Sequence, residues 1–499
     1  MTADAMIKAG GENDGRWAII DIGSNSVRLV IYDGPARAPF PICNEKALCG
    51  LGRDMDDGDL LNAAAVESAL SILARFRTLL AEHGEPPARV VATAAVRDAR
   101  NGPEFVEAVR ALGLMIDVIP GAEEARLSGL GVVSFEPGAS GLVGDMGGGS
   151  LELIRLDAGE IGNTSSLSIG PFRLMKHSKG DHKIAAAEIE TALSGVPWLH
   201  GVTTASLYAV GGAWRAIARI NMQLRHHPLS VLHHYEVPAR QVIETCELVA
   251  RQSRLSLEET PGVSAKRVDT LPYAALVLKA VMLTAGCERM VVSAGGIREG
   301  LLYDALPLSA RGEDPLIAGA RFLGQRLSPE AAIGEAVAAF TDKLFSAESP
   351  THRRLRTAAC LMTDAGAYFH PDLRGAQAFD IALRAPFYGV THPERAALAL
   401  SLFCRHEGAN AAFPEPAILA MLTEDERRRA VQIGLALRFA SALAPKAPHA
   451  IRMCALEPAG DRLLFTAPAA LKPLMDETAR RRLDALASSL ALKASTAFG

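Results

Sequence analysis

The feature that most constrains the fold is a pattern that occurs twice in the chain. An apolar strand ends in aspartate, passes through a glycine-containing turn and continues as a second apolar strand. The first copy spans residues 17–31 with Asp21 at the end of its first strand, and the second spans 141–153 with Asp145 in the same place. Glycine allows backbone N–H groups to surround an anion, because it has no Cβ and tolerates positive φ. One copy would be typical of an ordinary tight hairpin, but two copies with matching flanks predict two phosphate-binding hairpins.

Both turns also carry side chains that can donate to phosphate oxygens. The predicted phosphate-binding residues are Ser24, Asn25 and Ser26 in the first turn and Gly147, Gly148, Gly149 and Ser150 in the second. The aspartates that precede the turns cannot bind phosphate themselves, because like charges repel. We therefore expect Asp21 and Asp145 to hold a metal ion or to orient water.

Two further apolar runs end in a pair of glycines and enter a helical pattern. The pairs are Gly211 with Gly212 and Gly295 with Gly296. A helix that begins at such a turn directs its first N–H groups toward a bound anion. Each pair alone is equally typical of ordinary packing in an α/β domain. Beside the two hairpins, all four glycines are candidates for phosphate binding.

Six segments of the chain resemble the exopolyphosphatase and guanosine pentaphosphate phosphohydrolase (Ppx/GppA phosphatase) family. They occur in the family's order and are Asp21–Ser26, Ala92–Arg97, Gly121–Leu127, Asp145–Ser150, Ser168–Gly170 and Gly295–Gly300. The family belongs to the superfamily of acetate kinase, sugar kinases, heat-shock chaperones and actin. The resemblance implies an α/β fold with two actin-like (ribonuclease H-like) lobes and an interlobe cleft.

The strand and helix patterns place a first lobe at residues 1–134 and a second at 135–311. Residues 312–499 lose the strand pattern and become rich in Ala, Leu and Arg, which predicts a helical domain with a small C-terminal α+β portion. This region resembles the histidine-aspartate phosphohydrolase-like domain of longer family members. Thr363 stands where a ligand histidine would precede Asp364, so we expect its metal motif to be degenerate.

The resemblance implies that Glu124 is the base that activates water, because it matches the second glutamate of the family's Glu-Glu-Ala-Arg segment. Glu123 is the neighbour that could be confused with it. Without the resemblance, both would be interpreted as first-turn carboxylates that the helix dipole favours. Arg97 follows a strand and suits a bidentate grip on phosphate oxygens, although it could equally be a surface arginine. The predicted catalytic set is Glu124, Asp145 and Arg97.

The predicted metal ligands are Asp21, Asp145 and Glu152. Mg²⁺ is the expected ion, because it is a hard cation that commonly bridges carboxylates and phosphate oxygens. Glu152 lies on a strand and could equally be a solvated residue.

Composition narrows the class of protein. The chain has 52 basic and 56 acidic residues and a net charge of −4, which argues against a protein that coats nucleic acid. Its seven cysteines include no Cys-x-x-Cys pair, so we expect neither a disulfide framework nor a zinc site built on them. We find no export signal or membrane span and expect a cytoplasmic protein.

The resemblance implies an exopolyphosphatase that removes terminal orthophosphate from inorganic polyphosphate with Mg²⁺. The first alternative is a guanosine pentaphosphate (pppGpp) 5′-phosphohydrolase, since both activities occur in the family. A second alternative is a non-catalytic nucleotide-binding regulatory module. The expected partners are polyphosphate, pppGpp under the first alternative, and a second copy of the chain in a homodimer.

Overall fold

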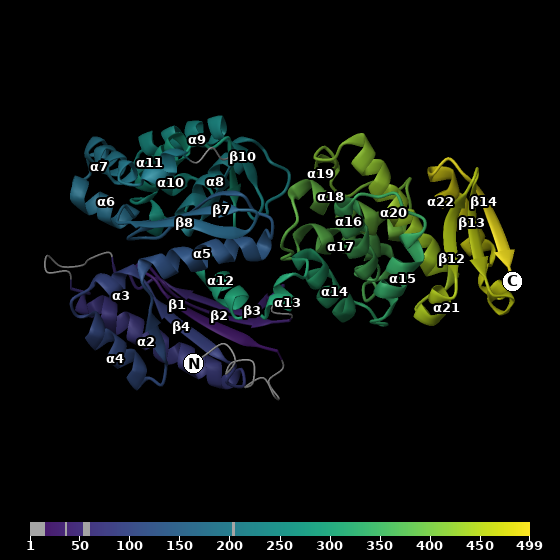
Figure 1. Cartoon of the computed structure of the whole chain (residues 1–499), viewed down its shortest axis with the longest axis horizontal. Coiled ribbons are helices and arrows are strands. Elements are labelled where there is room, and N and C mark those ends of the chain that lie inside the picture. Colours follow the sequence, from purple (N-terminus) through teal and green to yellow (C-terminus); the bar gives the residue numbers. More distant parts are fainter. Residues whose placement is uncertain (1–14, 35–36, 53–59, 202–204) are drawn as a thin grey trace. The chain divides into compact units, whose positions relative to one another are not determined.

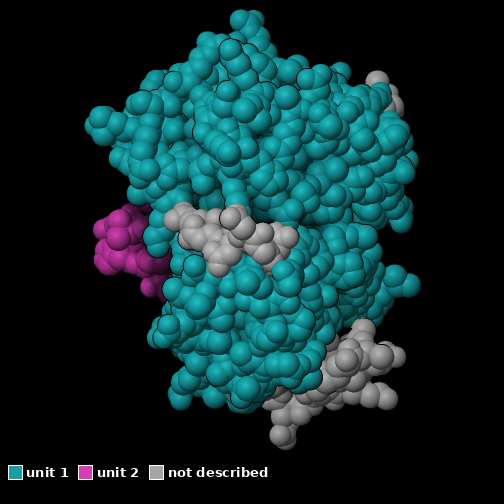
Figure 2. Space-filling view, turned by 90° about the vertical axis from the view of Figure 1, so that its left-hand side faces the viewer, with its two compact units in different colours: residues 1–312 teal, residues 313–499 magenta. Residues whose placement is uncertain are grey.

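The structure, a computed structural model, describes residues 15–34, 37–52, 60–201 and 205–499. The chain forms two compact units, residues 1–312 and 313–499, which Figure 2 draws in teal and magenta. Within the described residues, no helix combines the length and the apolarity needed to cross a membrane.

The first unit contains a five-stranded mixed sheet in the order β3-β2-β1-β4-β5 (Figure 1). Its strands are β1 (Trp17–Ile22), β2 (Val27–Asp33), β3 (Phe40–Ala47), β4 (Ala88–Ala92) and β5 (Ile116–Val118). β1 and β2 form the first predicted hairpin as an antiparallel pair, whereas β4 and β5 continue the sheet in parallel. The register of the hairpin places Asp21 opposite Arg28.

A second sheet in the same unit has the order β10-β11-β9-β6-β7-β8. Its strands are β6 (Gly141–Met146), β7 (Leu151–Asp157), β8 (Glu160–Leu167), β9 (Ser206–Val210), β10 (Glu236–Pro238) and β11 (Arg289–Val292). β8-β7-β6-β9-β11 repeats the strand order and directions of the first sheet, and β10 adds an antiparallel edge strand. Here the register places Asp145 opposite Glu152. The repeated hairpin thus opens two sheets of one topology, which confirms the predicted mixed α/β fold.

Helices cover the faces of both sheets. They are α2 (Ala63–Glu82), α3 (Ala94–Asp98), α4 (Gly102–Ala111), α5 (Gly121–Phe135), α6 (Pro171–Ser178), α7 (His182–Ser194), α8 (Gly212–Leu224), α9 (Ala239–Arg251), α10 (Arg254–Glu259), α11 (Leu271–Thr284), α12 (Ile297–Asp304) and α13 (Leu308–Arg311). The first sheet packs on α2 and α4 through Phe76 and Phe105, and on α5 and α12 through Leu127 and Leu301. α5 also packs on the second sheet through Val132 and therefore lies between the two sheets (Figure 1).

α5 and α12 approach each other closely because glycines line their contact. A Cβ on Gly131 would lie 2.2 Å from the carbonyl oxygen of Gly296, and one on Gly300 would lie 1.9 Å from that of Leu127. Any larger residue at these positions would force the two backbones apart. This contact fixes the start of α12 beside α5, and both elements reach the site described below.

Trp214, in the first turns of α8, is fully buried in the core of the second lobe. Its Nε1 donates to the carbonyl oxygen of Ala274 at 3.1 Å, and a Cβ on Gly144 would lie 2.6 Å from its ring. The indole therefore packs directly on the backbone of β6. This packing holds the N-terminal end of α8 next to the second hairpin.

The second unit is mostly helical and ends in a small sheet. Its helices are α14 (Pro315–Leu327), α15 (Ile333–Asp342), α16 (Pro350–Leu361), α17 (Arg374–Arg384), α18 (His392–Glu407), α19 (Pro416–Leu419), α20 (Glu424–Leu443), α21 (Pro448–Arg452) and α22 (Glu477–Ser489). Strands β12 (Ala455–Ala459), β13 (Arg462–Ala467) and β14 (Lys493–Phe498) form the sheet. The predicted helical domain with a C-terminal α+β portion is present.

Asp364, which follows Thr363 in the predicted degenerate motif, is buried among hydroxyl and cationic groups. Its carboxylate accepts a hydrogen bond from Ser328 Oγ at 2.8 Å, lies 3.4 Å from Arg405 and pairs with Lys446. Cationic side chains therefore balance its charge. The likeness of this unit to a histidine-aspartate domain stays a prediction.

Candidate active site

One cleft of the first unit is lined by both hairpin turns and has a volume of about 200 Å³. The predicted site residues that line it are Asp21, Ser24, Asn25, Ser26, Glu124, Asp145, Gly147, Gly148, Ser150, Glu152, Gly211, Gly212 and Gly296. Segments far apart in the sequence thus converge on one place. Arg97, Gly149 and Gly295 are outside this lining.

Four carboxyl groups form the acidic wall of the cleft. Asp21 and Asp145 lie near the ends of β1 and β6, Glu152 lies on β7 opposite Asp145, and Glu124 lies in the first turn of α5. Burial raises the pKa of Asp21, and the charge of Arg298 opposes that rise. Burial also raises the pKa of Asp145 and of Glu152, and neighbouring carboxylates raise both further.

Hydrogen bonds orient the two carboxylates of the second hairpin. Ser128 Oγ donates to Asp145 Oδ2 at 2.6 Å, and Ser166 Oγ donates to Glu152 Oε1 at 3.0 Å. These contacts use one oxygen of each group. Carboxylate oxygens are the donors that a hard divalent cation takes, and such a cation would relieve the repulsion between these groups. The type of donor therefore suits Mg²⁺, while among the described residues no three of these carboxylates bring oxygens within 4.8 Å of one another.

Glu124 and Glu123 differ sharply in environment. Glu124 is 5% exposed and lines the cleft. Burial raises its pKa to about 7, the charges of Asp145 and Asp21 add to the rise, and the hydrogen bond from Arg97 opposes it. The carboxylate of Glu123 instead binds the guanidinium of Arg126 at 2.8 Å. The geometry distinguishes the two glutamates, which the sequence could not do from local residues.

Arg97 lies on α3 and holds Glu124 in place. Its Nη1 donates to Glu124 Oε2 at 2.9 Å and to the carbonyl oxygen of Ile119 at 3.1 Å, while its Nε donates to Asp98 at 3.2 Å. We predicted that this arginine grips phosphate directly, and that role stays a prediction. In the structure its guanidinium hydrogen-bonds Glu124 and lies outside the lining of the cleft.

Two of the predicted phosphate-binding glycines, Gly149 and Gly295, lie outside the lining of the cleft, and their predicted role stays a prediction. A Cβ on Gly295 would lie 2.1 Å from the carbonyl oxygen of Gly131, at the contact of α5 with the turn before α12. The carbonyl oxygen of Gly149 accepts the N–H of Gly170 at 3.2 Å. A Cβ on Gly149 would also lie 3.3 Å from Ser24 Oγ, so the two hairpin turns touch each other here.

Sequence reasoning missed the basic wall of the cleft. Among the described residues, its five cationic side chains are Arg28, Lys46, Arg215, Arg267 and Arg298. Burial lowers the pKa of Lys46 to about 8, and the charges of the surrounding arginines lower it further. Burial also lowers the pKa of Arg215 to about 10, with Arg298 and Arg28 contributing. Arg298 lies 3.4 Å from Asp21, and the five cations together attract an anionic ligand.

A signal for two of these arginines was present in the sequence. Arg215 and Arg298 lie in the first turns of α8 and α12, just after the Gly-Gly pairs. The helix dipole disfavours a cation at a helix N-terminus. An arginine there indicates that an anion is expected at the same end of the helix.

The fold and the cleft define a two-lobed α/β protein whose cleft combines buried carboxylates with cationic side chains. Residues 30–309 match the profile of the Ppx/GppA phosphatase family, and residues 328–496 match the profile of the exopolyphosphatase C-terminal domain. The chain belongs to the Ppx/GppA phosphatase family, as its motifs predict.

Two enzymes from Aeromonas species are similar to part of the chain. The guanosine-5′-triphosphate,3′-diphosphate pyrophosphatase of Aeromonas hydrophila is 28% identical over 299 residues, which are 59% of this chain and 60% of the relative. The enzyme of the same name from Aeromonas salmonicida is 29% identical over 299 residues with the same coverage. The chain thus matches 60% of the length of these relatives.

Solved structures of the family share the fold of the first unit. A crystal structure of an exopolyphosphatase from Cytophaga hutchinsonii is 26% identical, with a TM-score of 0.53, and the match covers 58% of this chain and 96% of that one. The Aquifex aeolicus member of the family is 24% identical, with a TM-score of 0.50, over 57% of this chain and 96% of that one.

Proposed function

We propose that this protein is an exopolyphosphatase that hydrolyses the terminal phosphoric anhydride of inorganic polyphosphate with Mg²⁺ as cofactor. The observation that carries the proposal is a single cleft lined both by buried carboxylates and by five cationic side chains of the described residues. Hydrolysis of a phosphoric anhydride needs both kinds of side chain. Carboxylates would hold the metal and supply the base at the reacting phosphoryl group, while cationic side chains neutralise the rest of the polyanion.

Glu124 is suited to activate the attacking water. A general base works best when its pKa is near the working pH, and burial raises the pKa of this carboxyl to about 7. The water oxygen bonds to the terminal phosphorus as Glu124 accepts its proton. The bridging P–O bond then breaks, and the shortened polyphosphate leaves with the electron pair.

The remaining groups of the cleft bind and orient the substrate. The N–H group of Gly148 and the hydroxyl of Ser24 would donate to phosphate oxygens, whereas the N–H of Gly147 closes the turn by donating to the carbonyl oxygen of Ser150 at 3.0 Å. Asp21, Asp145 and Glu152 would hold Mg²⁺, which supplies neutralisation of phosphate charge when bound. Guanidinium groups of the basic wall would bind the phosphates behind the terminal one.

Two observations favour polyphosphate over a nucleotide. Phe172 is the one aromatic side chain among the described residues that line the cleft, so a guanine base has little to stack on. The second unit also matches the C-terminal domain of exopolyphosphatases. The second candidate, pppGpp 5′-phosphohydrolase, is supported by the names of the curated relatives.

The test is orthophosphate release from long-chain polyphosphate and from pppGpp, measured side by side with Mg²⁺. Glu124→Gln should abolish release, and Glu123→Gln should retain it because Glu123 pairs with Arg126 away from the cleft lining. Faster release from polyphosphate supports the proposal, and a strong preference for pppGpp would replace it with the second candidate. Turnover of neither substrate would instead favour a non-catalytic nucleotide-binding module.

A homodimer and a cytoplasmic location also stay predictions. Sedimentation velocity of the purified chain tests the first of these. A single species with the mass of one chain would contradict it.

A further inference from the structure

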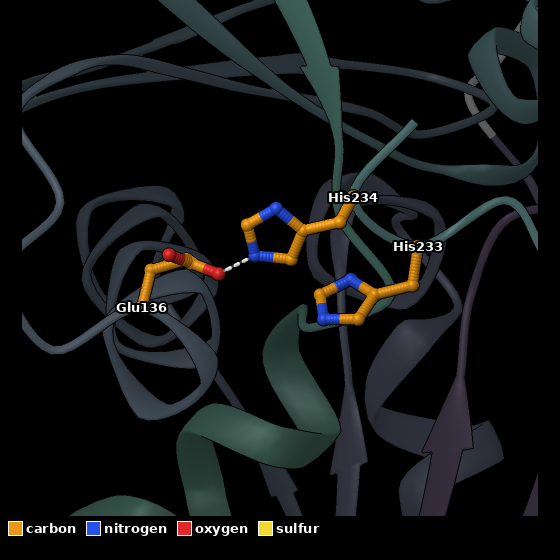
Figure 3. Close-up of side chains that lie close together, drawn as sticks. All are labelled: Glu136, His233 and His234. Atoms are coloured by element: carbon orange, nitrogen blue, oxygen red, sulfur yellow. Dashed lines mark ion pairs between the residues drawn. The ribbon is translucent and has the colours of Figure 1, made fainter. Parts of the chain in front are cut away.

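A second group of potential metal ligands lies outside the cleft (Figure 3). Glu136, His233 and His234 each offer one ligand atom, and these atoms all lie within 4.8 Å of one another. Glu136 Oε1 and His234 Nε2 already pair directly, as the dashed line in Figure 3 shows. We propose that these three residues form a binding site for a divalent transition-metal ion of the zinc class.

The site joins two segments that are far apart in the sequence. Glu136 is the C-terminal cap of α5, whereas the two histidines lie in the segment just before β10. That segment is tied to β11, because the N–H of His234 donates to the carbonyl oxygen of Val292 at 2.8 Å. Both imidazoles are almost completely buried, with 8% and 7% of their surfaces exposed.

An unusual backbone conformation brings the two adjacent histidines together. Consecutive residues of an extended segment point to opposite sides. His234 instead has a φ of 62°, in the left-handed region that few residues other than glycine occupy. The two rings consequently lie edge to face with their centroids 4.9 Å apart, and both present a nitrogen on the side of Glu136 (Figure 3). A conformation that costs energy and converges polar groups is typical of a binding site.

The chemistry of the ligands distinguishes this site from the cleft. Two imidazoles and one carboxylate suit zinc and its neighbours among the transition metals, whereas the all-carboxylate set of the cleft suits Mg²⁺. The two sites are also distant. Glu124 and Glu136 are twelve residues apart on α5 and its cap, which corresponds to about 18 Å along the helix axis.

Metal binding requires small exchanges of existing contacts. The ion would replace the proton shared by Glu136 and His234, and that proton would leave to solvent or move to Nδ1 of the ring. Nδ1 of His233 accepts the N–H of Ala294 at 3.2 Å, so the neutral ring carries its own proton on Nε2. Coordination through Nδ1 would exchange this hydrogen bond for a metal bond. Three protein ligands leave a fourth position for water.

The position of Ala294 gives the site a connection to the cleft. Ala294 lines the cleft and directly precedes the Gly295–Gly296 turn that enters α12. A metal bound to His233 would therefore act on the backbone of the cleft wall as well as on the end of α5.

The experiment measures zinc binding to the full-length protein in the presence of saturating Mg²⁺, which occupies the carboxylates of the cleft. After removal of metals and dialysis against limiting Zn²⁺, we expect one zinc per chain by mass spectrometry of the elements. His234→Gln should weaken zinc affinity about tenfold or more, since even the loss of a residue that only hydrogen-bonds to a metal ligand weakens affinity that much. His200→Gln, which changes an exposed histidine, should leave it unaltered.

A spectroscopic readout on the unaltered chain covers the case in which the variant does not fold. X-ray absorption at the zinc edge should show imidazole scattering from two histidines in the Mg²⁺-saturated protein. Failure of this protein to retain zinc would overturn the proposal, as would a spectrum with oxygen ligands alone. An equal loss of zinc in both histidine variants would also overturn it.

Discussion

Replacement of Arg97 by methionine should shift the pH profile of hydrolysis toward alkaline pH. The guanidinium of Arg97 donates to Glu124 Oε2 at 2.9 Å and lowers the pKa of a carboxyl that burial raises to about 7. A hydrogen bond to a charged group contributes about 1.5–3 kcal/mol. Its loss should raise the pKa of Glu124 by about 1 to 2, because 1.36 kcal/mol corresponds to one pKa unit.

The rate at neutral pH then follows from the fraction of Glu124 that is deprotonated. At pH 7 that fraction falls from about one half to between about 9% and 1%, a loss of about 5- to 50-fold in kcat/KM. Activity should recover as pH rises, since a proton leaves the carboxyl at higher pH in the variant. The assay is orthophosphate release across pH at a fixed Mg²⁺ concentration.

Arg126→Met is the matched control. Arg126 also pairs with a glutamate of α5, Glu123, but neither residue lines the cleft. In the pH profile of Arg126→Met, activity should fall on the acid side at the same pH as in the unaltered protein. The reasoning is refuted if Arg97→Met lowers kcat/KM equally at every pH, because the arginine would then act on the substrate and not through the pKa of Glu124.

Three further outcomes test other parts of the structure. Gly131→Ala should lower the free energy of unfolding by about 1–3 kcal/mol, because its Cβ would lie 2.2 Å from a backbone carbonyl oxygen. Urea unfolding measures this, and Gly138→Ala, whose Cβ would meet nothing within 4 Å, should be nearly neutral. The KM for polyphosphate should rise above pH 8, because Lys46 has a pKa of about 8 and loses its charge there. Lys46→Arg should remove that rise, since arginine stays charged, and a rise that persists would belong to another group. Asp145→Asn should raise the Mg²⁺ concentration for half-maximal activity about tenfold or more, whereas the exposed Asp157→Asn should not.

The sequence predicted the two hairpin sheets and the two aspartates of the acidic wall because both depend on local patterns, whereas the choice of Glu124 depended on the family resemblance. Asp21 and Asp145 end strands of the repeated hairpin, and parallel strands in each sheet bring such ends to one edge. The glycines were harder to interpret, because absence of a Cβ serves both phosphate binding and close packing. Gly295 lies in close contact with the backbone of Gly131 and Gly149 lies next to Ser24, and only the three-dimensional structure shows these contacts.

Most of the basic wall could not be predicted, for a different reason. Its members come from β2, β3, the segment before α11, α8 and α12. Arg215 and Arg298 each follow a Gly-Gly pair, but no spacing in the sequence links the other three. Arg28 and Lys46 meet across neighbouring strands because the register of β2 and β3 pairs them. That register depends on how the sheet assembles, which a strand pattern alone does not specify.

The two hairpins have the same topology, but the residue opposite the aspartate is a cation in one hairpin and an anion in the other. Asp21 faces Arg28 across the first, and Asp145 faces Glu152 across the second. A duplicated unit has therefore diverged at one register position, from which one copy offers a cation and the other an anion. The lining of the cleft is therefore asymmetric, with a cation opposite one aspartate and a second carboxylate opposite the other. Under the proposed function, we expect this asymmetry to give a linear polyanion one favourable direction, with its reacting terminus at the carboxylates of the second hairpin.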